Sequence, residues 1–438
     1  MNVIRSTQTH RAVALAATAA VLSLSLVSSA SAATPPVGPS TASFYAPAAS
    51  KIKGGKHGDV IWYRTAQSAL SMTNASKALN VIYKSQDLKG KNIPVSGTVW
   101  IPKGTAPTGG WPVISWGHGT TGSADICAPS RIADTVSGSY TSNVFPQINA
   151  WLAAGYAVTM SDYEGLGTPG VHHWLIGHSE GRGIIDIVTA AKKLDTHVGT
   201  KWIAAGHSQG GQSVLFAAAD AAKWAPSLQL KGVAAYAPAN HMKATVIFAT
   251  AAVKTPNGLS ALGALLLRTA TFADPTLKLV DIMNPAAYAL AGQLETKCLG
   301  TDGLSSPSSF GQFVPGNLMK TWTGSTWTSP KVLKGLNALD SPAISPSPKN
   351  NPNLVYTGPK LIMQGSSDST VPAFTTQALR DEISTADGAS TLTYHEYAGI
   401  DHGGVVAAGQ ADAIAWFAAR FASFGVGNSG NIAVRKKN

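Results

Sequence analysis

The hydrophobic pattern of the chain changes period repeatedly between residues 80 and 240. Short apolar runs bounded by Gly or Pro are typical of buried strands, whereas apolar residues three or four positions apart predict amphipathic helices. The predicted strands are 81–83, 97–101, 112–116, 156–160, 202–205 and 231–236, and the predicted helices between them are 145–154, 184–194 and 208–222. Strands that alternate with helices of this length indicate an α/β fold with a mostly parallel sheet and flanking helices.

This alternation stops after residue 240 and resumes near residue 351. The intervening residues first show helical spacing and then become rich in Ser, Pro, Asn, Gly and Trp. We therefore predict a core formed by residues 51–240 and 351–425, with an inserted, mainly helical cap at 241–350. Insertions in such folds lie over the carboxyl ends of the strands, where ligands bind.

Both ends of the chain differ in composition from the predicted core. Residues 1–32 resemble a secretory signal peptide, with Arg5 and Arg11 before an apolar stretch and an Ala-Ser-Ala cleavage site at its end. A membrane anchor is the alternative, but the apolar run is short and prolines follow it. Residues 33–50 are expected to form a flexible arm and residues 426–438 a flexible basic tail. We expect a secreted, extracellular protein without a transmembrane segment.

Composition excludes several other classes of protein. Of the 438 residues, 44% are hydrophobic and 13% are charged, which is incompatible with an intrinsically disordered chain. The net charge of +11 could indicate a nucleic-acid partner, but the basic residues are scattered and no binding motif appears, so none is expected. The two cysteines, Cys127 and Cys298, are an even number, which favours one disulfide in an exported protein over two free buried thiols.

The motif Gly206-His207-Ser208-Gln209-Gly210 stands between a predicted strand and a predicted helix. In G-x-S-x-G, small residues allow a sharp turn that lifts the serine hydroxyl out of the sheet. A serine needs a base to become a nucleophile, and the base needs an orienting acid. Ser208 is therefore the predicted nucleophile.

After residue 351, further strands are predicted at 360–363 and 391–397. Asp368 follows the first and His402 the second, in the chain order serine, acid and histidine that this motif requires. They are the predicted acid and base because both lie just beyond strand ends, at the same sheet edge as the nucleophile. His395 is the rival base and lies inside a strand. Asp401 and Asp381 are the rival acids, of which one adjoins the base and the other lies in a helix.

An oxyanion site requires N–H donors beside the nucleophile. One donor is expected from Gln209, and the other from Thr120 in the glycine-rich loop 116–122 after a buried strand. His172, His173 and His178 share one loop but lack the spacing and partners of a metal site, so a surface or cleft-rim loop and no metal are expected. No cofactor motif is present.

Taken together, these residues resemble the secretory lipase family, cap-bearing α/β-hydrolases with fungal and bacterial members, and its bacterial lipase A-like branch in particular. The resemblance rests on the oxyanion loop Gly117–Gly122, on Cys127–Ser130, on Ser161–Gly167, on the Gly206–Gly210 motif, and on Asp368 and His402. It implies an α/β-hydrolase with an inserted helical cap that hydrolyses lipid or other carboxylic esters without a cofactor, with lipid contact through the cap. A peptidase, or a polysaccharide, phenolic or polyester esterase, has the same triad. A non-catalytic secreted binding protein is the alternative outside enzymes.

Overall fold

The computed structural model describes residues 1, 34–134, 138–252, 258–299, 318–319, 329–388, 391–422 and 435–437. Thr34–Asn438 form one compact unit, to which the following description refers. The predicted signal peptide, apart from Met1, and most of the predicted basic tail lie outside the described residues. In the described ranges, no helix is both long and apolar enough to cross a bilayer.

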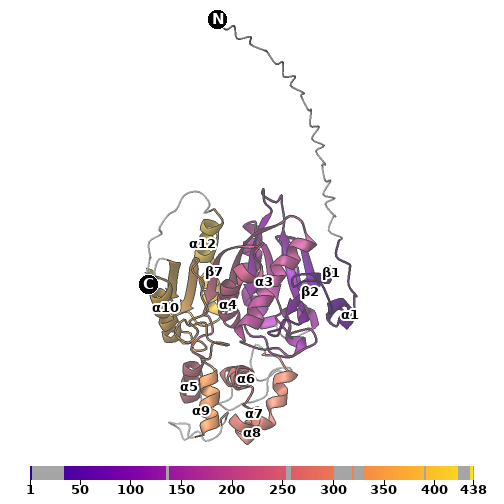
Figure 1. Ribbon diagram of the computed structural model, residues 1–438. Coiled ribbons are helices and arrows are strands. Elements are labelled where there is room, and N and C mark those ends of the chain that lie inside the picture. Colours follow the sequence, from indigo (N-terminus) through magenta and orange to yellow (C-terminus); the bar gives the residue numbers. More distant parts are fainter. Residues whose placement is uncertain are drawn as a thin grey trace. The chain divides into compact units, whose positions relative to one another are not determined.

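A single sheet of ten strands lies at the centre of the described unit, in the order β1-β2-β3-β5-β4-β6-β7-β8-β9-β10 (Figure 1). The pairs from β1 to β5 are antiparallel, and the pairs from β5 to β10 are parallel. The strands are β1 (Val60–Thr65), β2 (Ala75–Gln86), β3 (Asn92–Pro102), β4 (Trp111–Gly117), β5 (Ala157–Ser161), β6 (Val198–His207), β7 (Gln229–Tyr236), β8 (Lys360–Gly365), β9 (Leu392–Tyr397) and β10 (Arg435–Lys437). The predicted α/β fold with a mostly parallel sheet is confirmed.

Helices cover both faces of this sheet, because neighbouring strand residues point to opposite sides. Val113 packs with α3, α4 and α10 in one apolar cluster, whereas Ile114 packs with α2, α11 and α12 in another. These helices are α2 (Gly138–Ala153), α3 (Gly177–Leu194), α4 (Gln209–Trp224), α10 (Ala373–Asp387), α11 (Gly404–Ala408) and α12 (Gln410–Ala422). Both faces of the parallel strands are therefore buried, as is usual for parallel sheets.

The segment between β7 and β8 forms helices that pack around an apolar cluster of their own, which includes Leu265, Ile282 and Leu336. Its helices lie together below the sheet in Figure 1, beyond the carboxyl ends of the parallel strands. They are α5 (Met242–Ala252), α6 (Gly258–Ala273), α7 (Leu279–Ile282), α8 (Pro285–Ala289), the 3₁₀ helix η5 (Ala291–Glu295) and α9 (Pro330–Ala338). We call residues 241–350 the inserted segment. Within it, residues 253–257, 300–317 and 320–328 lie outside the described residues.

The stretch expected to form an N-terminal arm packs against the first strands. It contains η1 (Ala42–Tyr45) and the start of α1 (Ala49–Ile52), and its Phe44 and Tyr45 side chains are buried. The Tyr45 hydroxyl donates to the carbonyl oxygen of Ser130 at 2.8 Å. Three further 3₁₀ helices, η2 (Ser68–Leu70), η3 (Asp125–Cys127) and η4 (Pro129–Asp134), complete the connections.

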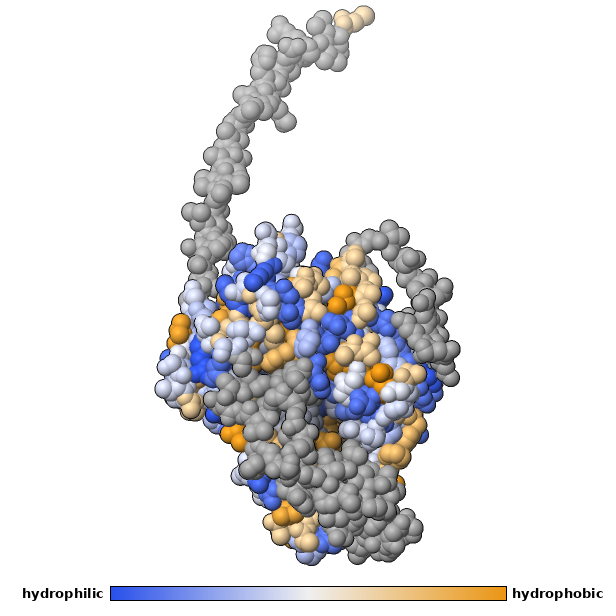
Figure 2. All heavy atoms as spheres, turned by 180° about the vertical axis from the view of Figure 1, so that it is seen from behind, coloured by the Kyte–Doolittle hydropathy of each residue, from blue (hydrophilic) through white to orange (hydrophobic). Residues whose placement is uncertain are grey.

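The surface mixes hydrophilic and hydrophobic residues over the face that Figure 2 shows. Several large exposed apolar side chains of the described chain lie in separate loops, for example Leu88, Val171 and Val355. Single exposed apolar residues of this kind are normal on a protein surface.

Candidate active site

Ser208 lies in the sharp turn between β6 and α4, with φ 58° and ψ −117°. A positive φ is strained for a residue other than glycine, and such strain persists only where the surroundings hold it. Here the Ser208 N–H donates to the carbonyl oxygen of Tyr236 at 2.9 Å, and the N–H of Ala239 donates to the Ser208 carbonyl at 3.0 Å. The turn after β7 therefore fixes the serine.

Glycines at the turn allow the backbone to approach the loop after β4. A Cβ atom on Gly210 would come within 1.9 Å of the Gly117 carbonyl oxygen, and one on Gly206 within 2.4 Å of the Gly210 carbonyl oxygen. The start of α4 consequently packs directly on the backbone that leads to Thr120. This contact explains why the motif needs glycine on both sides of the serine.

His402 and Asp368 form a hydrogen-bonded pair, with 2.7 Å between His402 Nδ1 and Asp368 Oδ2. Gln364 Nε2 donates to the same oxygen at 3.0 Å, and the N–H groups of Thr370 and Val371 each donate to Oδ1 at 2.8 Å. Burial alone would raise the pKa of Asp368, but the charge and hydrogen bond of His402 and the two N–H groups together hold that pKa below its usual value. The carboxylate stays ionised and fixes the Nδ1–H tautomer, which leaves His402 Nε2 as a proton acceptor.

His207, next to the serine, links this pair to the turn. Its Nε2 donates to the carbonyl oxygen of His402 at 2.9 Å, and the two rings lie 4.6 Å apart. Burial lowers the pKa of His207 to about 3, so the ring is neutral. In the described part of the chain no hydrogen bond joins Ser208 Oγ to His402 Nε2. The distance between nucleophile and base is often long in an enzyme without substrate and shortens when substrate binds.

The rival residues have other partners. His395 Nδ1 lies 3.1 Å from Asp412 Oδ2 on α12. Asp401 accepts the N–H of Gly404 at 2.7 Å and so caps α11, and Asp381 is exposed on α10. The structure thus brings Asp368 and His402 together and places none of the three rivals in that pair.

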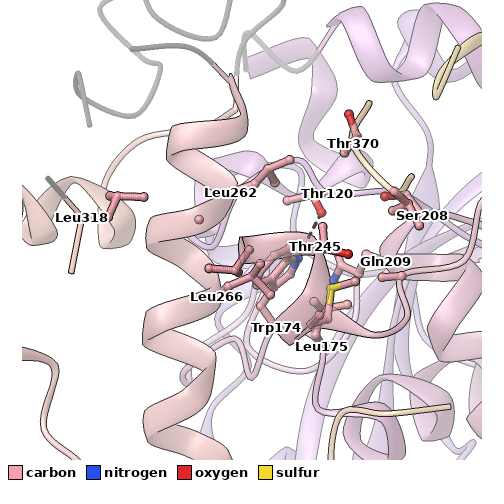
Figure 3. A pocket seen from close by; sticks show the side chains of 15 residues that line it. Thr120, Trp174, Leu175, Ser208, Gln209, Thr245, Leu262, Leu266, Leu318 and Thr370 are labelled. Atoms are coloured by element: carbon pink, nitrogen blue, oxygen red, sulfur yellow. Dashed lines mark hydrogen bonds between the residues drawn. The ribbon is translucent and has the colours of Figure 1, made fainter. Parts of the chain in front are cut away.

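Thr120 and Gln209 line the same pocket as Ser208 (Figure 3). The Thr120 side chain is held by Trp174, whose indole Nε1 donates to Thr120 Oγ1 at 3.1 Å. The residues predicted to form the oxyanion site therefore surround one space with the predicted nucleophile.

The structure contains the Cys127–Cys298 disulfide, with a Cα–Cα distance of 5.4 Å. It joins the loop after β4 to the inserted segment. Beside it, the Leu299 N–H donates to the Thr121 carbonyl oxygen at 2.9 Å. The inserted segment is therefore tied covalently to the loop that carries Thr120.

The pocket at Ser208 is largely apolar and measures about 640 Å³, counting its open mouth. One side of its wall comes from α5 and α6 of the inserted segment. These wall residues are Met242, Thr245, Val246, Leu262, Gly263 and Leu266, and Leu318 adds to them. An apolar wall with a few polar groups at one end is typical of a binding site for a small apolar molecule.

A buried polar cluster below the turn was not predicted from the sequence. Gln209 Nε2 donates to Glu180 Oε1 at 2.7 Å and to His172 Nε2 at 3.2 Å, and Glu180 also accepts the Leu175 N–H at 2.8 Å. Burial raises the pKa of Glu180 to about 8 and lowers that of His172 to about 3. The expectation of a surface or cleft-rim loop is therefore wrong for His172, which is buried. The sequence signal that could have indicated a buried Glu180 is its position on an otherwise apolar face of a helix.

Replacing Glu180 by Gln is expected to make the protein less sensitive to rising pH. Between the usual pKa of a glutamate and about 8, the folded state binds a proton that the unfolded state has lost, so Glu180 makes folding less favourable as pH rises. The melting temperature of Glu180→Gln minus that of the wild type should therefore increase from pH 5 to pH 8, a window that follows from this pKa. Asp381→Asn, at an exposed carboxyl, is the matched control. A difference that stays constant with pH would contradict the assignment.

No group of three or more His, Cys, Asp or Glu in the described ranges could hold a metal ion. The three histidines around residue 172 instead have separate partners. His172 binds Gln209, His173 lies 3.6 Å from Glu164, and His178 lies 2.7 Å from Asp220.

Comparison with known proteins gives one family. The model of the family described as "Secretory lipase" matches residues 131–428, more than half of the chain. Candida antarctica lipase A in its closed state is similar in structure, with a TM-score of 0.65 at 20% identity over 85% of this chain and 84% of that one. The rice cell wall degrading esterase LipA from Xanthomonas oryzae is similar with a TM-score of 0.64 at 19% identity, over 82% of this chain and 97% of that one. No curated protein matches the sequence. At these identities the two structures support the fold.

Proposed function

The chain belongs to the secretory lipase family, and from this premise we propose that it is a secreted serine lipase or esterase that cleaves acylglycerols or related carboxylic esters. Family membership supports a carboxylic ester hydrolase. The observation that carries the finer proposal is the apolar pocket at Ser208, beside the Asp368–His402 pair.

In the proposed reaction, Ser208 Oγ attacks the ester carbonyl carbon while His402 Nε2 accepts the hydroxyl proton. The N–H groups of Thr120 and Gln209 stabilise the oxyanion of the tetrahedral intermediate. The bond to the leaving alcohol then breaks as His402 returns the proton to the alcohol oxygen, which leaves an acyl-enzyme. Water, deprotonated by His402, attacks this ester in the same way and releases the carboxylic acid. Asp368 stabilises the imidazolium throughout, and no cofactor takes part.

The pocket wall favours an acyl chain as the bound group. Leu262, Leu266 and Leu318 offer only apolar surface, so an acyl chain can leave water there. A peptide or polysaccharide would place hydrogen-bonding groups against this wall without partners, which costs free energy. We propose that the inserted segment acts as a cap that binds the acyl chain.

A contact with a lipid surface is part of the proposal. Phe248 on α5 and Phe374 at the start of α10 are both exposed, and their ring centroids lie 6.0 Å apart. Phe248 follows the pocket-lining residue Val246 by two positions, and Phe374 follows the pocket-lining residue Val371 by three. This apolar pair next to the pocket supports contact between the cap and an emulsified ester.

Secretion is supported by the disulfide and by the family. Disulfides form and persist mainly in oxidising compartments outside the cytoplasm. The covalent link between Cys127 and Cys298 is therefore consistent with an exported protein.

Replacing Leu262 by Trp is expected to shift the preference of the enzyme towards short acyl chains. Leu262 is partly exposed and lines the pocket, so an indole there shortens the space for the chain. We expect kcat/KM for p-nitrophenyl palmitate to fall by about tenfold or more, because losing the contacts of about one or two methylene groups has an effect of that size. The value for p-nitrophenyl butyrate should change little, because its chain is too short to reach the indole.

The measurement is initial rates on p-nitrophenyl esters from acetate to stearate, together with emulsified triacylglycerol. Leu333→Trp is the matched control, because Leu333 is exposed on α9 and does not line the pocket. Equal losses on all esters would show that the pocket does not hold the acyl chain. Failure of the wild type to hydrolyse any of these esters would contradict the proposed function itself.

A further inference from the structure

The hydrogen bond between Trp174 and Thr120 determines where the Thr120 hydroxyl proton can go. An indole N–H is only a donor, so Thr120 Oγ1 must be the acceptor at 3.1 Å. A threonine hydroxyl has one proton and two acceptor sites, so accepting this bond leaves its own proton to be donated. In the part of the chain that the structure describes, Thr120 Oγ1 has no second partner to receive that proton.

The position of this hydroxyl is fixed by its surroundings. Trp174 is buried, and its carbonyl oxygen accepts the Thr269 hydroxyl of α6 at 3.0 Å. Two residues after Thr120, Gly122 pairs with Cys298 in an isolated β-bridge, next to the disulfide. The side chain is thus held on one side by the indole and on the other by a covalently anchored loop.

The free proton is available to a group that binds in the pocket. Thr120 lines the pocket together with Ser208 and Gln209 (Figure 3), and the rest of the wall is mainly apolar. Charge develops there only on the carbonyl oxygen of the ester that Ser208 attacks. A preorganised donor that finds its partner only in the transition state lowers the barrier rather than the KM.

We propose that the Thr120 side-chain hydroxyl is a third donor to the oxyanion, in addition to the two N–H groups, and that Trp174 orients it. The inference rests on the proposed function, because it requires Ser208 to be the nucleophile. Accepting the indole N–H also polarises the hydroxyl and strengthens the bond that it donates. Thr120 is then a catalytic residue through its side chain, and Trp174 is a positioning residue.

Thr120→Val tests the hydroxyl, because valine keeps the shape of the side chain and the backbone N–H. We expect kcat for p-nitrophenyl butyrate to fall by about 10²-fold to 10³-fold with KM nearly unchanged, as when one oxyanion donor is removed. Thr120→Ser should recover most of the rate. Thr385→Val, on α10 outside the pocket lining, is the matched control. Thr385 is exposed and its hydroxyl donates to the Asp381 carbonyl oxygen at 2.8 Å, so its removal should leave kcat unchanged.

Trp174→Phe tests the orientation by removing the indole N–H. It should lower kcat by about tenfold in the wild type and have no further effect in Thr120→Val, because both changes act on the same bond. The proposal is overturned if Thr120→Val keeps kcat within about threefold of the wild type. It is also overturned if Thr120→Ser is as slow as Thr120→Val at equal melting temperature, or if only KM changes. Activity retained in Ser208→Ala would instead overturn the proposed function, so the two failures are distinguishable.

Discussion

Ser208→Ala is expected to reduce kcat for ester hydrolysis by a factor on the order of 10⁶ while the protein stays folded. The substitution removes one hydroxyl, which lies at the pocket and contributes no buried hydrogen bond to the turn. The residual rate should come from the oxyanion site and from substrate binding alone. Because the residues of a triad act as a unit, adding His402→Ala to Ser208→Ala should cost little more.

The measurement combines initial rates with labelling by a fluorophosphonate, which reacts with an activated serine. Wild-type protein should be labelled at one serine, and Ser208→Ala should not be labelled. His395→Ala is the matched control for the base, since His395 pairs with Asp412 away from the pocket, and most activity should remain. Near-normal turnover by purified Ser208→Ala would show that Ser208 is not the nucleophile. Loss of activity in His395→Ala with activity retained in His402→Ala would move the base to His395.

The positions of Ser208, Asp368 and His402 in the sequence were sufficient to predict that they lie at one edge of the sheet. Each follows a strand of the parallel part, and parallel strands place their carboxyl ends at the same edge. The fold class could be predicted for the same reason, because the alternation of strand and helix periods depends on local residues alone. The family comparison confirms the resemblance on which the ester chemistry rests.

The polar partners of these residues could not be predicted, because they depend on contacts between distant parts of the chain. Trp174 reaches Thr120 across 54 positions, and Glu180 reaches Gln209 across 29. Contacts at such sequence separations produce no periodic pattern in the sequence. His172 lies in a loop, as expected, but it is buried, and Arg268 of α6 donates to its carbonyl oxygen at 3.0 Å. Packing between the inserted segment and the core determines whether such a loop residue is buried. Hydrophobic periodicity in the sequence gives no information on this packing.

Gly210→Ala is expected to be the most destabilising single substitution at the site. The added Cβ would lie 1.9 Å from the Gly117 carbonyl oxygen and 2.8 Å from that of His118, and both are backbone atoms that cannot rotate away. Overpacking a core usually costs about 1–3 kcal/mol and occasionally more, and a backbone contact this short belongs at or above the upper end. To relieve it, α4 must move away from the loop after β4.

This movement separates the Gln209 N–H from Thr120, so the variant should lose activity even in the fraction that folds. Differential scanning calorimetry should show a large fall in the melting temperature, and kcat per titrated active site should fall with it. Gly292→Ala is the matched control in the inserted segment, since a Cβ there has nothing within 4 Å and should change neither value. A folded and active Gly210→Ala would mean that the turn and the oxyanion loop can separate without cost. The rigid placement of Thr120 against Ser208, on which the three-donor oxyanion site depends, would then be wrong.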